Sequence, residues 1–173
     1  TRSDSSAASD VYKRQLLAIL WLAAAGAAGA ASGDWNRNDH VEMRLISAVS
    51  GVGELKKISA GLHFRMQPGW KLYWRTPGDA GFPPLANWSA SENVSKVDIQ
   101  WPAPKRFSIF ELETLGYEDE VILPLNAAVT KPGEPVKFAA NVDYLTCKDI
   151  CIPYSAMATL SVGGGEAAAS EFA

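Results

Sequence analysis

Residues 136–162, VKFAANVDYLTCKDICIPYSAMATLSV, decide the fold class of this chain. Apolar side chains occupy every second position from 136 to 144 and again from 152 to 162. A period of two is typical of a β-strand with one buried face. Cys147 and Cys151, the only two cysteines of the chain, lie between these two halves. We therefore predict two strands joined by a turn that holds the cysteine pair.

Working outward, the same alternation appears at residues 41–45, 58–66, 70–74, 97–101 and 121–125. Glycine, proline, asparagine or aspartate separates these stretches, as is typical of strand boundaries. Seven short strands with turn signals between them predict an all-β fold, an immunoglobulin-like antiparallel β-sandwich. Two long connections rich in turn-forming residues, 75–95 and 102–120, are predicted to be loops, where function often lies.

Length and charge restrict the function classes. A chain of 173 residues predicts one domain, which we place at residues 34–162, and the Gly- and Ala-rich residues 163–173 predict a flexible linker or tail. The formal net charge is −3, and no run of Lys and Arg forms a local basic face. Phosphate binding needs such a face, so nucleic acid is excluded as a partner.

The N-terminus has the composition of a targeting segment. An apolar run, LLAILWLAAA at residues 16–25, follows Lys13 and Arg14 and precedes small residues. This layout predicts a secretory signal peptide over residues 16–33, cleaved after Ala30, Ala31 or Gly33, or an uncleaved membrane tether. Residues 1–15 do not begin with Met and resemble read-through sequence, so we interpret them as a non-native or leader segment.

The cysteine pair allows three interpretations. A disulfide across a turn can act as a structural staple, although so short a loop gives less stabilisation than a long one. Cys147 and Cys151 can bind Cu(I) together with Met157, because thiolate and thioether ligands suit this ion. The pair can also carry out thiol–disulfide exchange through a mixed disulfide. The spacing alone does not separate the staple from exchange.

Neighbouring residues favour exchange modestly. Lys148 can stabilise a thiolate and Asp149 opposes it, which suits an electron relay better than a strong oxidant. Tyr144 and Tyr154 each lie three residues from a cysteine, and we predict that they either belong to the core or line the site. The two histidines, His40 and His63, fall on different predicted strands and add no evident metal ligand.

The segment DYLTC at 143–147, followed by CIP at 151–153, resembles the active-site segment of the N-terminal periplasmic domain of DsbD-type thiol:disulfide interchange proteins. The closer resemblance is to the branch that contains the ScsB copper-tolerance proteins. Other matching motifs follow in the same order as in that family: PGWK at 68–71, YWRTPGDAG at 73–81, WPAP at 101–104, GYE at 116–118 and LPL at 123–125.

The resemblance implies an immunoglobulin-like fold and a periplasmic oxidoreductase with Cys147 and Cys151 as its redox pair. It implies no cofactor. Electrons would come from a membrane-embedded or thioredoxin-like redox domain and pass to exported proteins, and a longer parent chain would attach the domain to a membrane domain. The best-known members have a longer spacing between the cysteines, so their partners do not transfer to this chain. They also shield the pair with a loop, which implies a cap at 106–116 with Phe107 and Phe110.

The sequence thus predicts a protein-disulfide oxidoreductase domain. It leaves open which cysteine attacks. The alternative is a non-catalytic immunoglobulin-like binding module that carries either a structural disulfide or a Cu(I) site.

Overall fold

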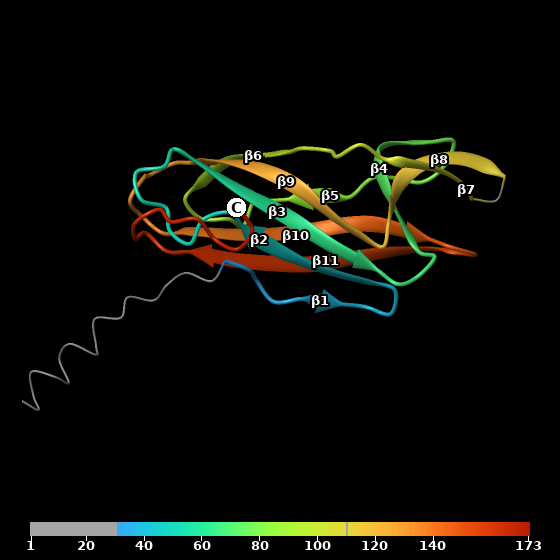
Figure 1. The fold of residues 1–173 in the computed structure, drawn as a ribbon, viewed down its shortest axis with the longest axis horizontal. Helices are drawn as coiled ribbons and strands as arrows, with labels where there is room; N and C mark the ends of the chain where they lie inside the picture. Colours follow the sequence, from blue (N-terminus) through green and yellow to red (C-terminus); the bar gives the residue numbers. More distant parts are fainter. Residues whose placement is uncertain (1–30, 110) are drawn as a thin grey trace, which may run out of the picture.

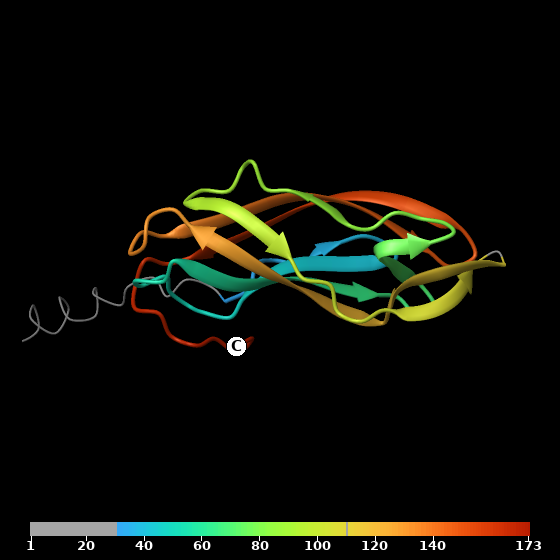
Figure 2. The ribbon, with the colours of Figure 1, turned by 90° about the horizontal axis from the view of Figure 1, so that it is seen from above.

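The structure, a computed structural model, describes residues 31–109 and 111–173 (Figure 1). Two β-sheets lie face to face, and Figure 2 shows them as two layers along the long axis. The described residues include no helix that is long and apolar enough to cross a membrane. The predictions for residues 1–15 and for most of 16–33, and the assignment of Phe110 to the cap, lie outside the described residues.

The first sheet has the order β1-β2-β3-β9-β6. Its strands are β1 (Asn36–Arg37), β2 (Val41–Ser47), β3 (Lys57–Met66), β9 (Glu120–Val129) and β6 (Val94–Ile99). The second sheet has the order β11-β10-β4-β8-β7, and the short β5 also pairs with β10. Its strands are β11 (Cys151–Val162), β10 (Val136–Cys147), β4 (Lys71–Gly78), β8 (Leu112–Glu118), β7 (Lys105–Ile109) and β5 (Leu85–Asn87). All of these strand pairs are antiparallel.

The core lies between the two sheets. The apolar faces predicted from the period of two point inward, as Phe64 on β3, Leu123 on β9 and Phe138 on β10 illustrate. The edge-to-face contact of Phe64 with Tyr144, at 5.4 Å between ring centroids, joins the two layers. The prediction of an all-β, immunoglobulin-like antiparallel sandwich is confirmed, and each of the seven predicted strands has its counterpart.

The prediction that residues 102–120 form a long loop is wrong. This segment contains the β7–β8 hairpin, in which Lys105 pairs with Gly116 and Ile109 pairs with Leu112. The alternation of β8 is hard to recognise, because its buried positions include Thr114 and Gly116 instead of large apolar residues. The other predicted loop, 75–95, contains the short β5.

Residues 163–173 lie against the body of the domain. The carbonyl groups of Gly165 and Ala168 accept backbone hydrogen bonds from Gly53 and Ser50, at 2.9 and 3.0 Å, and Ser170 N donates to the Ala48 carbonyl at 2.9 Å. Their Gly- and Ala-rich composition predicts a loose tail. These contacts use main-chain atoms, which do not depend on side-chain type, so composition does not reveal them.

Candidate redox site

The cysteine pair closes the β10–β11 hairpin. The two strands pair without a register break from Val136 opposite Val162 to Cys147 opposite Cys151. Lys148 N donates a hydrogen bond to the Ile150 carbonyl at 3.0 Å across the three-residue turn. This pairing brings the two cysteine Cα atoms to 4.2 Å, and the cysteines form a disulfide.

The two sulfur-bearing residues differ sharply in exposure. Cys147 is 0% exposed, whereas Cys151 is exposed. The side chain of Cys147 packs with Tyr73 and Ile109 in a small apolar cluster separate from the main core, with Phe107 and Leu145 at its margin. One sulfur is therefore shielded by protein, while its partner belongs to a residue that faces solvent.

Tyr73 supplies a polar contact to this disulfide. Its hydroxyl donates a hydrogen bond to Cys147 Sγ at 3.1 Å and lies 3.9 Å from Cys151 Sγ. Burial raises the pKa of the Tyr73 hydroxyl, which therefore remains protonated and able to donate at neutral pH. The alternation of residues 70–74 predicts that Trp70, Leu72 and Trp74 face the core. It therefore also predicts that Tyr73 lies on the opposite face of the strand.

The backbone at Gly81 lies directly against the Tyr73 ring. Its φ of +94° lies in the left-handed region that favours glycine, and a Cβ at this position would come within 2.4 Å of the ring. The turn-rich segment after Tyr73 therefore covers the ring directly. This contact gives a physical role to the GDAG portion of the YWRTPGDAG motif.

Phe107, which the sequence predicts as a cap residue, lies beside the buried cysteine. It is half-buried and packs against the cluster of Tyr73, Ile109 and Cys147. The Lys71 ammonium lies 5.3 Å from its ring centroid. A Cβ at Gly116 would come within 2.8 Å of the Phe107 ring, so the absence of a side chain there lets the ring approach the sheet.

Tyr144 and Tyr154 lie on the other face of the hairpin. Residues three apart on a strand point to opposite sides, so neither tyrosine shares the face of its nearest cysteine. Tyr144 is buried in the main core and accepts a hydrogen bond from Asn38 Nδ2 at 2.8 Å, and burial raises its pKa to about 12. The Tyr154 hydroxyl lies 2.6 Å from His40 Nδ1. The structure thus places both away from the sulfur atoms.

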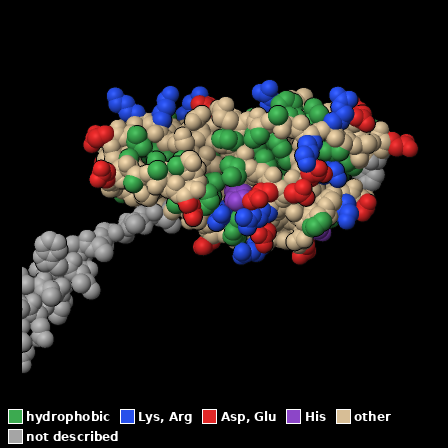
Figure 3. All heavy atoms as spheres, viewed as in Figure 1, with side chains coloured by type: hydrophobic (Ala, Val, Ile, Leu, Met, Phe, Trp, Pro, Cys, Tyr) green, Lys and Arg blue, Asp and Glu red, His purple; other side chains and the backbone are tan. Residues whose placement is uncertain are grey.

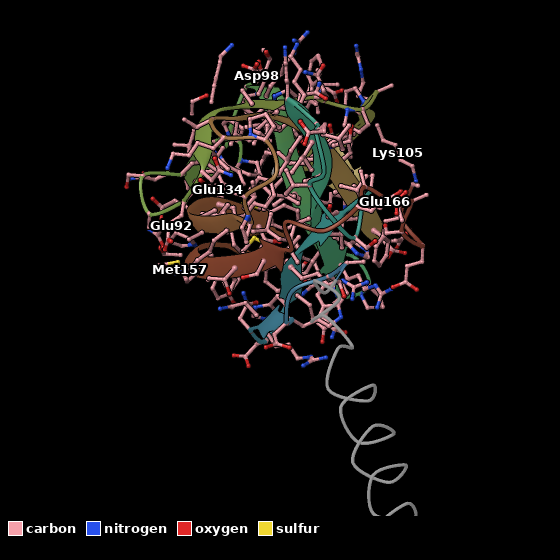
Figure 4. All side chains as sticks on the ribbon, turned by 90° about the vertical axis from the view of Figure 1, so that its left-hand side faces the viewer. Glu92, Asp98, Lys105, Glu134, Met157 and Glu166 are labelled. Carbon is pink, nitrogen blue, oxygen red and sulfur yellow. A yellow bond between two sulfur atoms is a disulfide. The ribbon has the colours of Figure 1, made fainter. Side chains whose placement is uncertain are left out.

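The structure does not bring Met157 to the cysteines. Six positions of one extended strand separate it from Cys151, a distance of about 20 Å at the usual strand rise. Its side chain is 54% exposed and points outward from β11 (Figure 4). Within the described ranges, no group of three or more His, Cys, Asp and Glu side chains could hold a metal ion.

Comparisons with known proteins bear on this geometry. A family model described as "Thiol:disulfide interchange protein DsbD, N-terminal" matches residues 47–161. The crystal structure of the N-terminal periplasmic domain of ScsB from Proteus mirabilis is similar, with 30% sequence identity and a TM-score of 0.62. That match covers 75% of this chain but 51% of the solved one, so the chain spans about half of that domain.

A second solved structure, the reduced N-terminal domain of DsbD from Neisseria meningitidis, has 14% identity and a TM-score of 0.38. Its match covers 73% of this chain and 90% of that one. No curated protein matches the chain. The family match extends over both sheets and both cysteines, and with the disulfide it supports thiol–disulfide exchange as the chemistry of the site. The chain belongs to the family of DsbD N-terminal domains.

Proposed function

We propose that this domain is a periplasmic redox relay. It accepts electrons from a membrane-embedded or thioredoxin-like redox domain and passes them to exported proteins through Cys147 and Cys151. The observation that carries the proposal is the asymmetry of the disulfide: Cys151 is exposed, and Cys147 is buried beside a hydrogen-bond donor.

The asymmetry supports a distinct role for each sulfur. A partner thiolate attacks Cys151 Sγ, and a new disulfide forms between the partner and Cys151. The Cys147–Cys151 bond breaks, and its electron pair leaves on Cys147 Sγ, where the Tyr73 hydroxyl stabilises the thiolate. A second partner thiolate then attacks the partner's own sulfur and releases Cys151. The domain has gained two electrons, and the partner has become a disulfide.

The reverse sequence delivers these electrons. The Cys151 thiolate attacks a disulfide of the exported protein, and Cys147 resolves the mixed disulfide by attacking Cys151 Sγ. The target is reduced to two thiols and the Cys147–Cys151 bond is restored. The transfer of two electrons in these steps requires no metal or organic cofactor.

A structural staple is the competing function for the same bond. In the chain-entropy model a disulfide stabilises more as the closed loop lengthens, and this loop holds few residues. The long register of β10 and β11 already closes the hairpin without a covalent bond. The stabilisation gained from this disulfide is therefore small, which favours exchange as its role.

Two single-cysteine variants test the proposal. The reduced Cys147→Ser protein should react rapidly with glutathione disulfide and form a trapped mixed disulfide, because Cys151 is exposed. The reduced Cys151→Ser protein should react at least ten-fold more slowly, because Cys147 is buried. Mass spectrometry of quenched samples measures both rates.

The reduction potential of the unaltered protein supplies the decisive comparison. Equilibration with glutathione buffers should give a value above about −300 mV, since structural disulfides typically lie below it. A lower value together with no mixed disulfide from Cys147→Ser would identify the bond as a staple and reject the relay. Stoichiometric Cu(I) binding that is lost in Cys147→Ser would support the metal-binding alternative.

A further inference from the structure

We propose that the free edge of β11 from Cys151 to Ser155 is a docking strand, which pairs through its backbone with an extended partner segment that lies beside the attacking thiolate. This inference rests on the proposed exchange function and adds how the partner is held. It concerns main-chain atoms beside the disulfide.

β11 is an outermost strand of its sheet. It pairs with β10 on one side, and in the described part of the chain no strand pairs with it on the other. Figure 1 shows the tip of the β10–β11 hairpin running on past the end of β1. The unpaired edge therefore begins at the exposed Cys151.

The direction of the edge groups follows from the pairing of the two cysteines. In antiparallel sheets, hydrogen-bonded and non-hydrogen-bonded pairs alternate, with typical Cα separations of about 5.5 and 4.5 Å. Cys147 and Cys151 lie 4.2 Å apart, and the flanking Lys148 N donates to Ile150 O. They form a non-hydrogen-bonded pair. The N–H and C=O groups of Cys151 therefore point away from β10, toward the free edge.

Pro153, Ser155 and Met157 follow Cys151 at steps of two, so their backbone polar groups also point toward the free edge. Proline has no N–H, and strands tolerate it at an edge where no ladder hydrogen bond is lost. The Met157 carbonyl, two residues beyond Ser155, lies 3.5 Å from Asn36 Nδ2, confirming that these groups face away from β10. The edge thus offers the N–H of Cys151 and Ser155 and the C=O of Cys151, Pro153 and Ser155.

The N-terminal segment limits the length of the site. Asn36 reaches the edge at Met157, and a Cβ at Gly33 would come within 2.1 Å of the Thr159 carbonyl. Residues of this segment therefore cover the edge from Met157 onward. The edge that stays open is the short stretch next to the reactive sulfur, and its shortness together with Pro153 protects the protein from nonspecific strand pairing.

The hairpin turn adds an apolar contact. Ile150 precedes Cys151 on the turn, and its side chain is 59% exposed. A partner segment paired with Cys151 would lie within reach of it. Backbone pairing is insensitive to side chains and would hold the partner thiolate near Cys151 Sγ, while Ile150 favours partners with an apolar residue near their cysteine.

The test compares Ser155→Pro with Ser155→Ala. The proline variant removes one edge N–H without breaking the ladder to β10, because this N–H faces outward. The alanine variant keeps the N–H and removes the hydroxyl that contacts Asn141 Oδ1. Reduction of the domain disulfide is followed with two reagents, a reduced thioredoxin and glutathione.

We expect Ser155→Pro to slow reduction by thioredoxin about five-fold, the effect of one backbone hydrogen bond of about 1 kcal/mol. Reduction by glutathione, which presents no strand of comparable length, should change less than two-fold, and Ser155→Ala should resemble the unaltered protein with both reagents. An unchanged thioredoxin rate in Ser155→Pro, or an equal loss with both reagents, would overturn the docking strand.

A second measurement does not depend on the proline variant folding. In the mixed disulfide of Cys147→Ser with a thioredoxin whose second active-site cysteine is replaced by serine, the Ser155 amide should exchange its hydrogen at least ten-fold more slowly than in the free variant. Equal exchange would reject the docking strand while leaving the relay intact. If the unaltered protein is reduced by neither reagent, the relay itself fails.

Discussion

The Tyr73 hydroxyl is placed to receive the charge that appears when the disulfide opens. Cys147 is fully buried, and a bare thiolate there would be costly without a donor. The 3.1 Å contact from Tyr73 supplies that donor, and the apolar ring beneath it excludes water. In the proposed exchange, one tyrosine would both shield the sulfur and stabilise its reduced form.

Replacing Tyr73 by Phe should lower the reduction potential of the pair. A hydrogen bond to a charged group contributes about 1.5–3 kcal/mol, and about 1.4 kcal/mol corresponds to 30 mV for this two-electron couple. The reduced form loses this stabilisation, so the potential should become more negative by about 30–60 mV. Equilibration with glutathione at pH 8 measures it.

Tyr154→Phe is the matched control for this substitution. It removes a hydroxyl from the opposite face of the hairpin, where the contact is His40 rather than sulfur. The potential of this variant should equal that of the unaltered protein. A Tyr73→Phe protein with an unchanged potential would show that the hydroxyl does not stabilise the thiolate.

At the scale of elements, the outward faces of β2, β3 and β9 carry a charged network instead of isolated polar residues. Arg44 Nε donates to His63 Nδ1 at 3.3 Å, His63 Nε2 contacts Glu120, and Arg65 Nε donates to Glu120 at 2.9 Å. Trp35 covers the network, with the guanidinium carbons of Arg44 and Arg65 at 4.4 and 4.7 Å from its ring centroid. Figure 3 shows a histidine among basic and acidic side chains on this side of the molecule.

This network makes stability depend on pH. Burial lowers the pKa of His63, and the charges of Arg44 and Arg65 add to the effect, although Glu120 opposes it. A depressed pKa means that the unfolded chain takes up a proton before the folded one does. The free energy of unfolding should therefore fall as pH decreases below about 6.5, by at most about 1.4 kcal/mol per pH unit for this one proton.

Urea unfolding between pH 7.5 and pH 5 measures this dependence. His63→Gln keeps a hydrogen-bonding side chain without a titrating ring, and its stability should change less over that range. Glu120 contributes at lower pH: hydrogen bonds from Arg65 and His63 lower its pKa, so its contribution is lost only as pH falls below about 4.5. The same slope in both proteins above pH 5 would contradict the assignment to His63.

At the scale of the whole molecule, the tip of the β10–β11 hairpin and the C-terminal tail, residues 163–173, lie far apart. β11 begins at Cys151 and runs for 12 residues, about 40 Å, toward the tail. The tail covers one side of an apolar groove of about 700 Å³, which is lined by Ile46, Ile122 and Phe172 among others. We therefore expect changes in the tail to affect the stability of the domain and changes at the hairpin tip to affect exchange.

Deleting residues 164–173 should destabilise the domain without changing its exchange chemistry. Three backbone hydrogen bonds to residues 48–53 are lost, at about 1 kcal/mol each, so the free energy of unfolding should drop by about 3 kcal/mol. Urea unfolding measures the loss, and the glutathione reduction rate should stay within two-fold. Phe172→Ala, which removes only the ring near Arg44, should cost less. A deletion that left stability unchanged would show that the tail contacts contribute nothing.

The fold class could be predicted from the sequence alone. Alternation with a period of two appears wherever one face of a strand is buried, so the alternating stretches predicted seven of the strands. The CxxxC spacing, together with ordered motifs elsewhere, predicts Cys147 and Cys151 as a redox pair, and the structure joins them in a disulfide. Strands whose buried positions are small or polar, as in β8, lack that signal and were missed.

The surroundings of the sulfur atoms could not be predicted from the sequence, because they depend on how the strands pair. The burial of Cys147 and its contact with Tyr73 arise from three strands, β4, β7 and β10, that are distant in sequence, while Cys151 begins β11 and is exposed. Tyr144 and Tyr154 are near the cysteines along the chain, yet an odd offset on a strand places a side chain on the opposite face. Local sequence encodes the period of a strand, whereas the neighbours of each face depend on which strands pair.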